Sequence, residues 1–383
     1  MEEHASWRDA NMCAPATVLS VRAIRLPAPG RGEDIQVRIS APATGDNLPI
    51  IIFSHGYGSS MDGYAPLADY WAAHGFVVIQ PTHLDSKRLG LAQEDPRRPL
   101  IWRTRVEDMK RILDDLDAVT QWVPGLEGRV DHGLVAASGH SFGGQTTSML
   151  LGARMLGPDG EGEDMSDRRV KAGILLASGG RGGVDLSPLG REITPYLNSG
   201  FDHMTTPALV VAGDADQSPL TTRGPDWFAD PYRLSPGRKA LLTLFCAEHM
   251  LGGVSGYAVT ETTDENPARV ALIQRMTLAY LQSVLLDDAT AWSSACEALA
   301  TEATPLGQVE GAAGGRPFPA EAAARSGRME GQECPRIRQL LSAAVDQLKT
   351  FSVVDVSGGS CWNPPFRSRK PVGRLCALMP DVR

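Results

Sequence analysis

Residues 139–143, with the sequence Gly-His-Ser-Phe-Gly, constrain the fold of this chain more than any other segment. They follow an apolar run at 134–138 and precede a helix-like stretch at 144–151. A Gly-x-Ser-x-Gly pattern between a strand and a helix is typical of a nucleophile elbow, a sharp turn that exposes the serine. The glycines allow close approach of strand and helix, and the helix N-terminus favours a developing negative charge. We therefore expect Ser141 to be a nucleophile; the alternative is a plain strand–helix turn.

A serine nucleophile needs an imidazole to take its proton, and a later histidine is well placed to do so. Residues 239–245 indicate a buried strand, and His249 follows it. The chain has seven other histidines. His249 is favoured over them because it follows the strand that comes after Asp214 and Asp216, the two candidates for the acid. We expect His249 to be the base.

The imidazole in turn needs a carboxylate that fixes its tautomer and stabilises the imidazolium. Residues 207–213 indicate a buried parallel strand, and Asp214 and Asp216 follow it. Asp216 is favoured because it lies past the strand end, where its side chain can turn back toward a histidine loop. Asp214 remains the alternative, although its position also suits a hydrogen bond within the turn.

Two backbone N–H groups are expected to form an oxyanion hole. One is that of Phe142, the residue after the proposed nucleophile. The other is expected from the glycine-containing loop 54–60, which follows an apolar strand at 48–53. Within that loop the amide of Tyr57, just after His-Gly, is the candidate donor. A plain glycine turn is the alternative for this loop.

Three stretches together resemble the alpha/beta-hydrolases: Phe-Ser-His-Gly at 53–56, Ala-Ala-His-Gly-Phe-Val-Val at 72–78 and Gly-His-Ser-Phe-Gly-Gly at 139–144. Within that superfamily the chain is similar to the group that holds platelet-activating-factor acetylhydrolases, chlorophyllases and bacterial polyester hydrolases, over about residues 17 to 300. The order Ser, Asp, His is also the alpha/beta-hydrolase order. The resemblance implies hydrolysis of carboxylic esters through an acyl-enzyme, without a cofactor. It implies these roles: nucleophile Ser141, acid Asp216, base His249, and oxyanion donors Phe142 and Tyr57.

The spacing of apolar runs predicts an α/β fold with a mostly parallel central sheet and helices on both faces. The resemblance implies that this is the alpha/beta-hydrolase fold. An antiparallel pair at 17–27 and 34–42 is expected to open it. Apolar residues recur at helical spacing over 101–123. Further helices are expected at 63–74, 265–286 and about 288–300.

The substrate pocket is expected beyond the C-terminal ends of the strands, where sites in such sheets lie. Trp227 and Phe228, in the proline-rich segment 217–237, are candidates for its apolar wall, together with Met250 and Tyr57. For Trp227 and Phe228 a role in anchoring the loop to the core is an equally good interpretation.

Composition limits the partners. The net charge is −8 and the isoelectric point about 5.5, which argue against nucleic-acid binding. No apolar stretch reaches the roughly 18 residues of a membrane span. The polar N-terminus does not resemble a signal peptide, so a cytoplasmic protein is expected. The six cysteines form no C-x-x-C pair, and no metal or cofactor is expected.

The expected substrate is a small-molecule or lipid-like ester. Two alternatives remain open: hydrolysis of a lactone, amide or carbon–carbon bond, or acyl transfer, on the same three residues; and a non-catalytic binding protein of the same fold. The sequence leaves the oligomeric state open.

Three regions are expected along the chain: an N-terminal tail at 1–16, a catalytic domain at 17–310 and a C-terminal extension at 311–383. The extension begins with a Gly- and Ala-rich stretch and carries 11 Lys and Arg against 6 Asp and Glu. Apart from one plausible helix it lacks periodicity. We therefore expect it to be poorly ordered, with a small docking module as the alternative.

Overall fold

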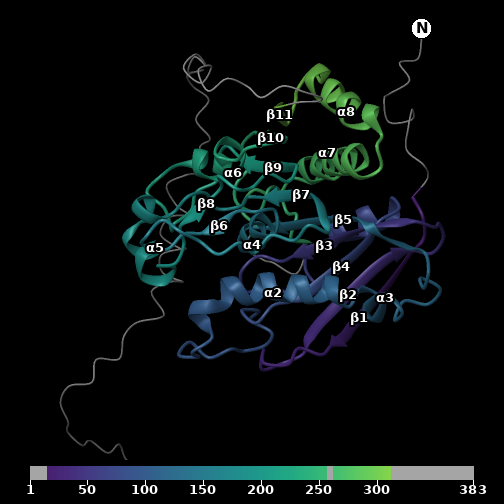
Figure 1. Cartoon of the computed structure of the whole chain (residues 1–383). Coiled ribbons are helices and arrows are strands. Elements are labelled where there is room, and N and C mark those ends of the chain that lie inside the picture. The colour runs from purple at the N-terminus through teal and green to yellow at the C-terminus, as the bar shows by residue number, and fades with distance from the viewer. Residues whose placement is uncertain (1–14, 257–261, 312–383) are drawn as a thin grey trace, which may run out of the picture. The chain divides into compact units, whose positions relative to one another are not determined.

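A nine-stranded sheet forms the centre of residues 15–256 and 262–311, the part of the chain that the computed structural model describes (Figure 1). All of the described residues lie in one compact unit. The strand order is β1-β2-β4-β3-β5-β7-β9-β10-β11. The strands are β1 (Val18–Leu26), β2 (Ile35–Pro42), β3 (Leu48–Ser54), β4 (Val77–Thr82), β5 (Val130–His140), β7 (Val170–Leu176), β9 (Ala208–Gly213), β10 (Lys239–Leu244) and β11 (Gly307–Glu310).

The six strands from β4 to β10 in this order run parallel, whereas β1, β2 and β11 add antiparallel pairs at the two edges. Every residue of β3, β4 and β9 is buried, because helices cover both faces of a parallel sheet. The edge strand β1 is partly exposed along most of its length. The opening antiparallel pair expected from the sequence is therefore present as β1 and β2.

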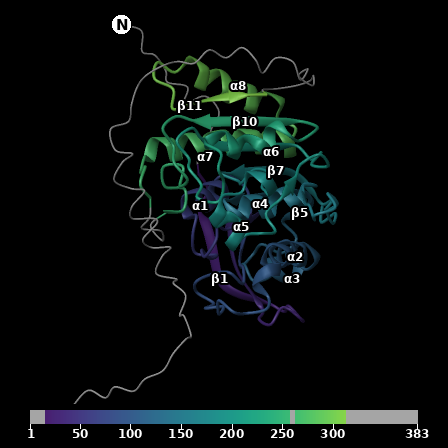
Figure 2. The same ribbon diagram turned by 90° about the vertical axis from the view of Figure 1, so that its left-hand side faces the viewer.

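Two groups of helices cover the sheet (Figures 1 and 2). Helices α1 and α7 pack against each other, and α8 packs on α7. Helix α4 packs on β3, β5 and β7, and α2 packs on α4. The helices are α1 (Ala65–Ala73), α2 (Ile101–Asp114), α3 (Leu116–Thr120), α4 (Phe142–Leu150), α5 (Pro188–Ile193), α6 (Asp230–Arg233), α7 (Pro267–Leu285) and α8 (Ala289–Thr301).

The predicted fold class is confirmed, and most expected elements lie within a few residues of their predicted bounds. One helix differs. The segment 101–123 is not continuous: it breaks at Asp115, whose φ of −117° and ψ of 29° are not helical. Aspartate competes with helical hydrogen bonding through its short side chain, which suits it to such a break.

Several short elements were not expected. They are α5, α6, the strand β11 and a two-stranded sheet of β6 (Arg154–Met155) and β8 (Ser199–Gly200). The expected extension lies outside the described residues from 312 onward, as do the first 14 residues of the expected tail. The three-region division of the chain stays a prediction.

The loops that carry the candidate site residues all leave the C-terminal ends of central strands. Tyr57 follows β3, Ser141 follows β5, Asp216 follows β9 and His249 follows β10. The C-terminal ends of parallel strands lie at the same edge of the sheet, where α/β folds place their sites. The topology therefore brings together four residues that are far apart in the sequence.

Candidate active site

The turn between β5 and α4 holds Ser141 in an unusual conformation. Its φ of 56° and ψ of −119° cost a residue with a side chain about 1–3 kcal/mol, so the surroundings must impose them. The Ser141 N–H donates to the Leu176 carbonyl at 2.8 Å. A Cβ at Gly139 would overlap the Gly143 carbonyl, and a Cβ at Gly143 would overlap that of Ser54. Both glycines of the motif are therefore required by close backbone approach.

Ser141, His249 and Asp216 form one chain of hydrogen bonds. His249 Nε2 lies 2.9 Å from Ser141 Oγ. On the other side of the ring, Nδ1 lies 3.0 Å from Asp216 Oδ2 and 3.2 Å from Oδ1. The Asp216 side chain is fully buried, whereas the His249 side chain is 35% exposed. The serine and the imidazole can thus meet a substrate, while the carboxylate is kept from solvent.

Asp214, the alternative acid, has a different partner. Its Oδ1 accepts a hydrogen bond from the Cys246 N–H at 2.6 Å, which ties the end of β9 to the turn after β10. The sequence suggested a hydrogen bond within its own turn, whereas this one joins two different turns. Of the two aspartates, Asp216 is the one hydrogen-bonded to His249.

The environment of His249 raises its pKa above the usual value. Burial by itself would lower the pKa, because it disfavours the charged ring. The negative charge of Asp216, its hydrogen bond to Nδ1 and the charge of Asp264 outweigh this effect. The site therefore stabilises an imidazolium, which is the form a base takes after it accepts a proton.

A buried ion pair that the sequence did not point to holds the loop around His249. Asp264 Oδ2 accepts hydrogen bonds from the N–H groups of Glu248 at 2.9 Å and Gly252 at 3.0 Å. Arg269 Nη1 donates to the same oxygen at 3.0 Å. The charged pair thus fixes the backbone on both sides of His249.

The two candidate oxyanion donors lie on segments that touch each other, the loop after β3 and the start of α4. The Phe142 and Tyr57 rings are 6.4 Å apart between centroids. Phe142 is the first residue of α4, where an N–H has no acceptor within the helix. Among the hydrogen bonds of residues 15–256 and 262–311, neither the Phe142 N–H nor the Tyr57 N–H has an acceptor. The oxyanion role of both amides stays a prediction.

The neighbouring peptide groups determine how the Tyr57 N–H is oriented. It shares a peptide plane with the Gly56 carbonyl, which accepts hydrogen bonds from His55 Nδ1 at 2.7 Å and the Ser59 N–H at 3.2 Å. In a trans peptide the N–H points away from the carbonyl. The Gly58 N–H donates to Asp85 Oδ2 at 3.2 Å. These bonds leave the Tyr57 N–H pointing away from the groups that anchor its loop.

A buried salt bridge lies beneath this loop. Arg105 Nη1 donates to both carboxylate oxygens of Asp85, at 2.6 and 2.7 Å, and neither side chain is exposed. Arg105 also donates to the His55 carbonyl and stacks over the Phe142 ring, 4.5 Å from its centroid. Burial alone would raise the pKa of Asp85, but the Arg105 charge lowers it to about 2. One cation therefore contacts both segments that carry the candidate donors.

A second buried chain of polar side chains lies next to it. Arg31 donates to Asp108 at 2.6 and 3.0 Å, and His83 Nδ1 lies 2.9 Å from Asp108 Oδ2. The other ring nitrogen of His83 lies 2.9 Å from Ser54 Oγ. The sequence analysis missed these residues. The available signal was that Asp108 and Arg105 fall at buried positions of the α2 pattern, where apolar residues are expected.

The residues expected to line the pocket differ in their surroundings. Trp227 and Phe228 are both buried, and Trp227 Nε1 donates to the Arg181 carbonyl at 2.6 Å. Phe228 packs against the His249 ring, with centroids 5.7 Å apart. Met250 is half-buried, and Tyr57 is 61% exposed. Trp227 thus anchors its loop, and the pocket role of all four residues stays a prediction.

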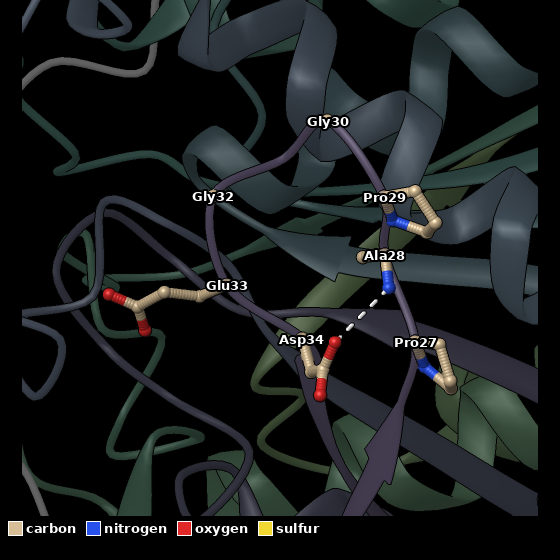
Figure 3. Close-up of a pocket in the computed structure, with 7 residues that line it drawn as sticks. All are labelled: Pro27, Ala28, Pro29, Gly30, Gly32, Glu33 and Asp34. Atoms are coloured by element: carbon tan, nitrogen blue, oxygen red, sulfur yellow. Dashed lines mark hydrogen bonds between the residues drawn. The ribbon is translucent and has the colours of Figure 1, made fainter.

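A shallow pocket lies elsewhere, along the loop that joins β1 to β2 (Figure 3). Its lining includes Glu33 and Asp34, and Asp34 Oδ1 accepts a hydrogen bond from the Ala28 N–H at 3.3 Å. None of the candidate site residues lines it.

Within the described ranges there is no cluster of three or more His, Cys, Asp and Glu suited to a metal ion. In the same ranges no helix is long and apolar enough to cross a membrane.

Similarity to known proteins agrees with this fold. The chlorophyllase family matches residues 21–154. The platelet-activating factor acetylhydrolase of Cavia porcellus is 28% identical over 169 residues, 35% of each chain. That of Bos taurus is 27% identical over 170 residues, again 35% of each. Chlorophyllase-1, chloroplastic, of Citrus unshiu is 29% identical over 119 residues, 29% of this chain and 31% of that protein. The alignments thus span about a third of these relatives.

The strand order and these matches together indicate the alpha/beta-hydrolase fold. Among proteins of that fold the chain resembles chlorophyllases and platelet-activating factor acetylhydrolases, which confirms the resemblance inferred from the sequence motifs. The chlorophyllase match contains Tyr57 and Ser141 but ends before Asp216 and His249. The pairing of these last two residues with Ser141 therefore rests on the geometry described above.

Proposed function

We propose that the protein is a serine hydrolase that cleaves carboxylic esters through an acyl-enzyme intermediate. The observation that carries this proposal is the hydrogen-bonded chain Ser141–His249–Asp216 at a strained strand-to-helix turn. The arrangement has the parts of a catalytic triad: a nucleophile, a base within hydrogen-bond reach of it, and a buried carboxylate that orients the base.

In the first half-reaction, Ser141 Oγ forms a bond to the ester carbonyl carbon while His249 Nε2 takes its proton. The resulting oxyanion accepts hydrogen bonds from the N–H groups of Phe142 and Tyr57. Asp216 holds the ring in the tautomer with a proton on Nδ1 and stabilises the imidazolium. Collapse of this oxyanion breaks the ester C–O bond, the imidazolium gives its proton to the leaving oxygen to form the alcohol, and the acyl group stays on Ser141.

In the second half-reaction, His249 Nε2 takes a proton from water, and the oxygen of that water bonds to the acyl carbon. Collapse of the second oxyanion breaks the bond to Ser141, and the serine regains its proton from the imidazolium. The products are a carboxylic acid and an alcohol. Every proton in the two half-reactions passes through His249 Nε2, while the two amides only donate hydrogen bonds to the oxyanion.

The relatives support the ester as substrate class, because the names chlorophyllase and platelet-activating factor acetylhydrolase both denote ester hydrolases. We propose a small-molecule or lipid-like ester as the substrate. The same triad can also hydrolyse lactones, amides or carbon–carbon bonds, or transfer an acyl group to an alcohol. These reactions are outcomes that product analysis separates.

Labelling with a fluorophosphonate tests the proposed nucleophile directly. The folded wild-type protein should gain one phosphonyl group on Ser141, located by peptide mass spectrometry, and Ser141→Ala should gain none. Incubation of an ester substrate with a competing alcohol then shows whether water or the alcohol takes the acyl group. A folded wild-type protein that resists labelling would favour the non-catalytic binding protein instead.

A further inference from the structure

His140, the residue between the first glycine of the elbow and Ser141, is buried and makes two hydrogen bonds. Its Nδ1 lies 2.9 Å from the Tyr64 hydroxyl, and its Nε2 lies 2.8 Å from the carbonyl oxygen of His249. The His140 and His249 rings are 5.1 Å apart between centroids. The side chain next to the proposed nucleophile is therefore bonded to the backbone of the proposed base.

Tyr64 extends this chain to the loop 54–60, which carries the proposed donor Tyr57 and which we call the oxyanion loop. Its hydroxyl accepts a hydrogen bond from the Gly56 N–H at 3.0 Å. Tyr64 is buried, its ring packs on Phe53 with centroids 4.8 Å apart, and its N–H donates to the Ser255 carbonyl at 3.0 Å. The phenol is thus fixed by packing and by its backbone, and it acts as a rigid support for the His55–Gly56 peptide, which lies next to the peptide that carries the Tyr57 N–H.

The donors and acceptors in this chain have a single consistent direction. A backbone N–H can only donate and a carbonyl oxygen can only accept. Gly56 therefore donates to the Tyr64 oxygen, the Tyr64 hydroxyl donates to His140 Nδ1, and His140 Nε2 donates to the His249 carbonyl. This assignment needs a neutral imidazole, and burial, with the nearby His249, lowers the pKa of His140 to about 3.

The oxyanion loop also leaves no space for a side chain here. A Cβ on Gly56 would lie 2.7 Å from the Tyr64 hydroxyl oxygen and 3.3 Å from His140 Nδ1. The glycine of the His-Gly pair is thus required by the close packing of this chain, in addition to any role in the turn. We name the chain from the Gly56 N–H through Tyr64 and His140 to the His249 carbonyl the loop relay.

We propose that Tyr64 and His140 are positioning residues, which hold the oxyanion loop and the His249 loop in register with Ser141. The inference rests on the proposed serine hydrolase activity and extends it to two residues that do not touch the substrate. A fixed distance between the oxyanion donors and the base matters because both act on the same tetrahedral intermediate. A misplacement of about 1 Å in such a site can cost on the order of 100-fold in rate.

Tyr64→Phe is the sharpest test, because it removes one oxygen atom and keeps the packed ring. It leaves the Gly56 N–H and His140 Nδ1 without partners. We expect kcat for a p-nitrophenyl ester to fall by about 10- to 100-fold, with KM nearly unchanged, since the relay affects the placement of catalytic groups rather than substrate contacts. The rate of phosphonylation by a fluorophosphonate should fall in parallel, because it uses the same groups.

Two His140 variants separate the effects of the two hydrogen bonds that its side chain makes. His140→Leu removes both hydrogen bonds, whereas His140→Gln keeps an amide donor near the position of Nε2. We expect His140→Gln to recover part of the kcat that His140→Leu loses. In the double variant Tyr64→Phe/His140→Gln the two losses should not add, because both break the same link.

Tyr280→Phe is the matched control. Tyr280 is also a buried tyrosine, packed edge-on against Trp292 in the contact of α7 with α8. The substitution Tyr280→Phe should leave kcat unchanged even if it lowers the melting temperature. To obtain kcat, the maximal rate is divided by the concentration of active sites that a fluorophosphonate titrates, so that unfolded protein is not counted.

The outcomes separate the relay from the function on which it rests. Suppose that the wild-type protein is active and that Tyr64→Phe and His140→Leu keep its kcat and its labelling rate. This result would overturn the relay and leave the serine hydrolase proposal intact. A kcat loss in Tyr280→Phe as large as that in Tyr64→Phe would also overturn it. A folded wild-type protein that neither cleaves esters nor reacts with the fluorophosphonate would overturn both proposals.

Discussion

Replacement of Arg105 by methionine should destabilise the protein strongly, because it leaves a buried carboxylate without its partner. Arg105 and Asp85 have no exposed side-chain surface and are joined by hydrogen bonds of 2.6 and 2.7 Å. Removal of one partner from a buried ion pair costs about 3–5 kcal/mol. The His55 carbonyl also loses a donor, which adds about 1–3 kcal/mol. The total is a large part of the roughly 5–15 kcal/mol that stabilises a typical protein.

Urea unfolding followed by circular dichroism measures this loss. Arg105→Met/Asp85→Asn should recover the part that arises from the uncompensated charge, because the asparagine is neutral and still accepts from the Gly58 N–H. In the single variant the pKa of Asp85 should rise, since burial then acts without Arg105. Its deficit relative to wild type should therefore shrink as the pH falls.

Two results would refute this reasoning. One is a loss below about 1 kcal/mol in Arg105→Met, which is typical of an ordinary substitution. The other is a double variant no more stable than the single one, which would mean that the buried charge of Asp85 is not the source of the loss.

Three further predictions concern the proposed site. Asp216→Asn should lower kcat by about 10⁴-fold, the loss known when a triad carboxylate becomes an amide, and Asp214→Asn should cost far less; steady-state kinetics of both variants on one ester decide this. The value of kcat/KM should rise with pH as His249 loses its proton, with a midpoint above 6.5 because the pKa of His249 is raised. Asp216→Asn should move that midpoint to lower pH. A value of kcat/KM that falls between pH 6 and 8 would contradict this prediction. The same raised pKa makes the folded state favour the protonated ring, so this contribution to stability is full below the unfolded pKa and disappears as the pH rises through the folded one. Gly143→Ala should abolish activity and lower the yield of folded protein, because the added methyl group meets the Ser54 carbonyl; normal activity in that variant would show that the turn relaxes.

Much of the fold could be predicted because the chain marks its strands clearly. The central strands are short apolar runs between turn residues, and β3, β4 and β9 are buried along their whole length. The long helices α2, α7 and α8 have apolar faces at helical spacing. Short elements such as β6 and β8 pair only two residues each, too few to leave a periodic signal.

The meeting of Ser141, Asp216 and His249 could be predicted for a related reason: each follows a recognisable strand, and the loops after parallel strands meet at one edge. The residues around them could not be predicted. Tyr64 and His140 are 76 positions apart, and Arg31 and Asp108 are 77 apart. No local pattern connects such pairs, because only the packed sheet brings them together. His140 even occupies the variable position of the elbow motif, where the sequence gives no reason for a histidine.

The most direct test of the central claim is the hydrolysis of p-nitrophenyl esters from acetate to palmitate by the wild-type protein and Ser141→Ala. The account predicts turnover that depends on the serine, with kcat lowered on the order of 10⁶-fold in the variant, as when the serine of a protease triad is removed. The profile over acyl-chain length would then show the size of the pocket. Near-normal turnover in a folded Ser141→Ala protein would contradict the assignment of the nucleophile. A folded wild-type protein that cleaves none of these esters would contradict the proposed esterase activity.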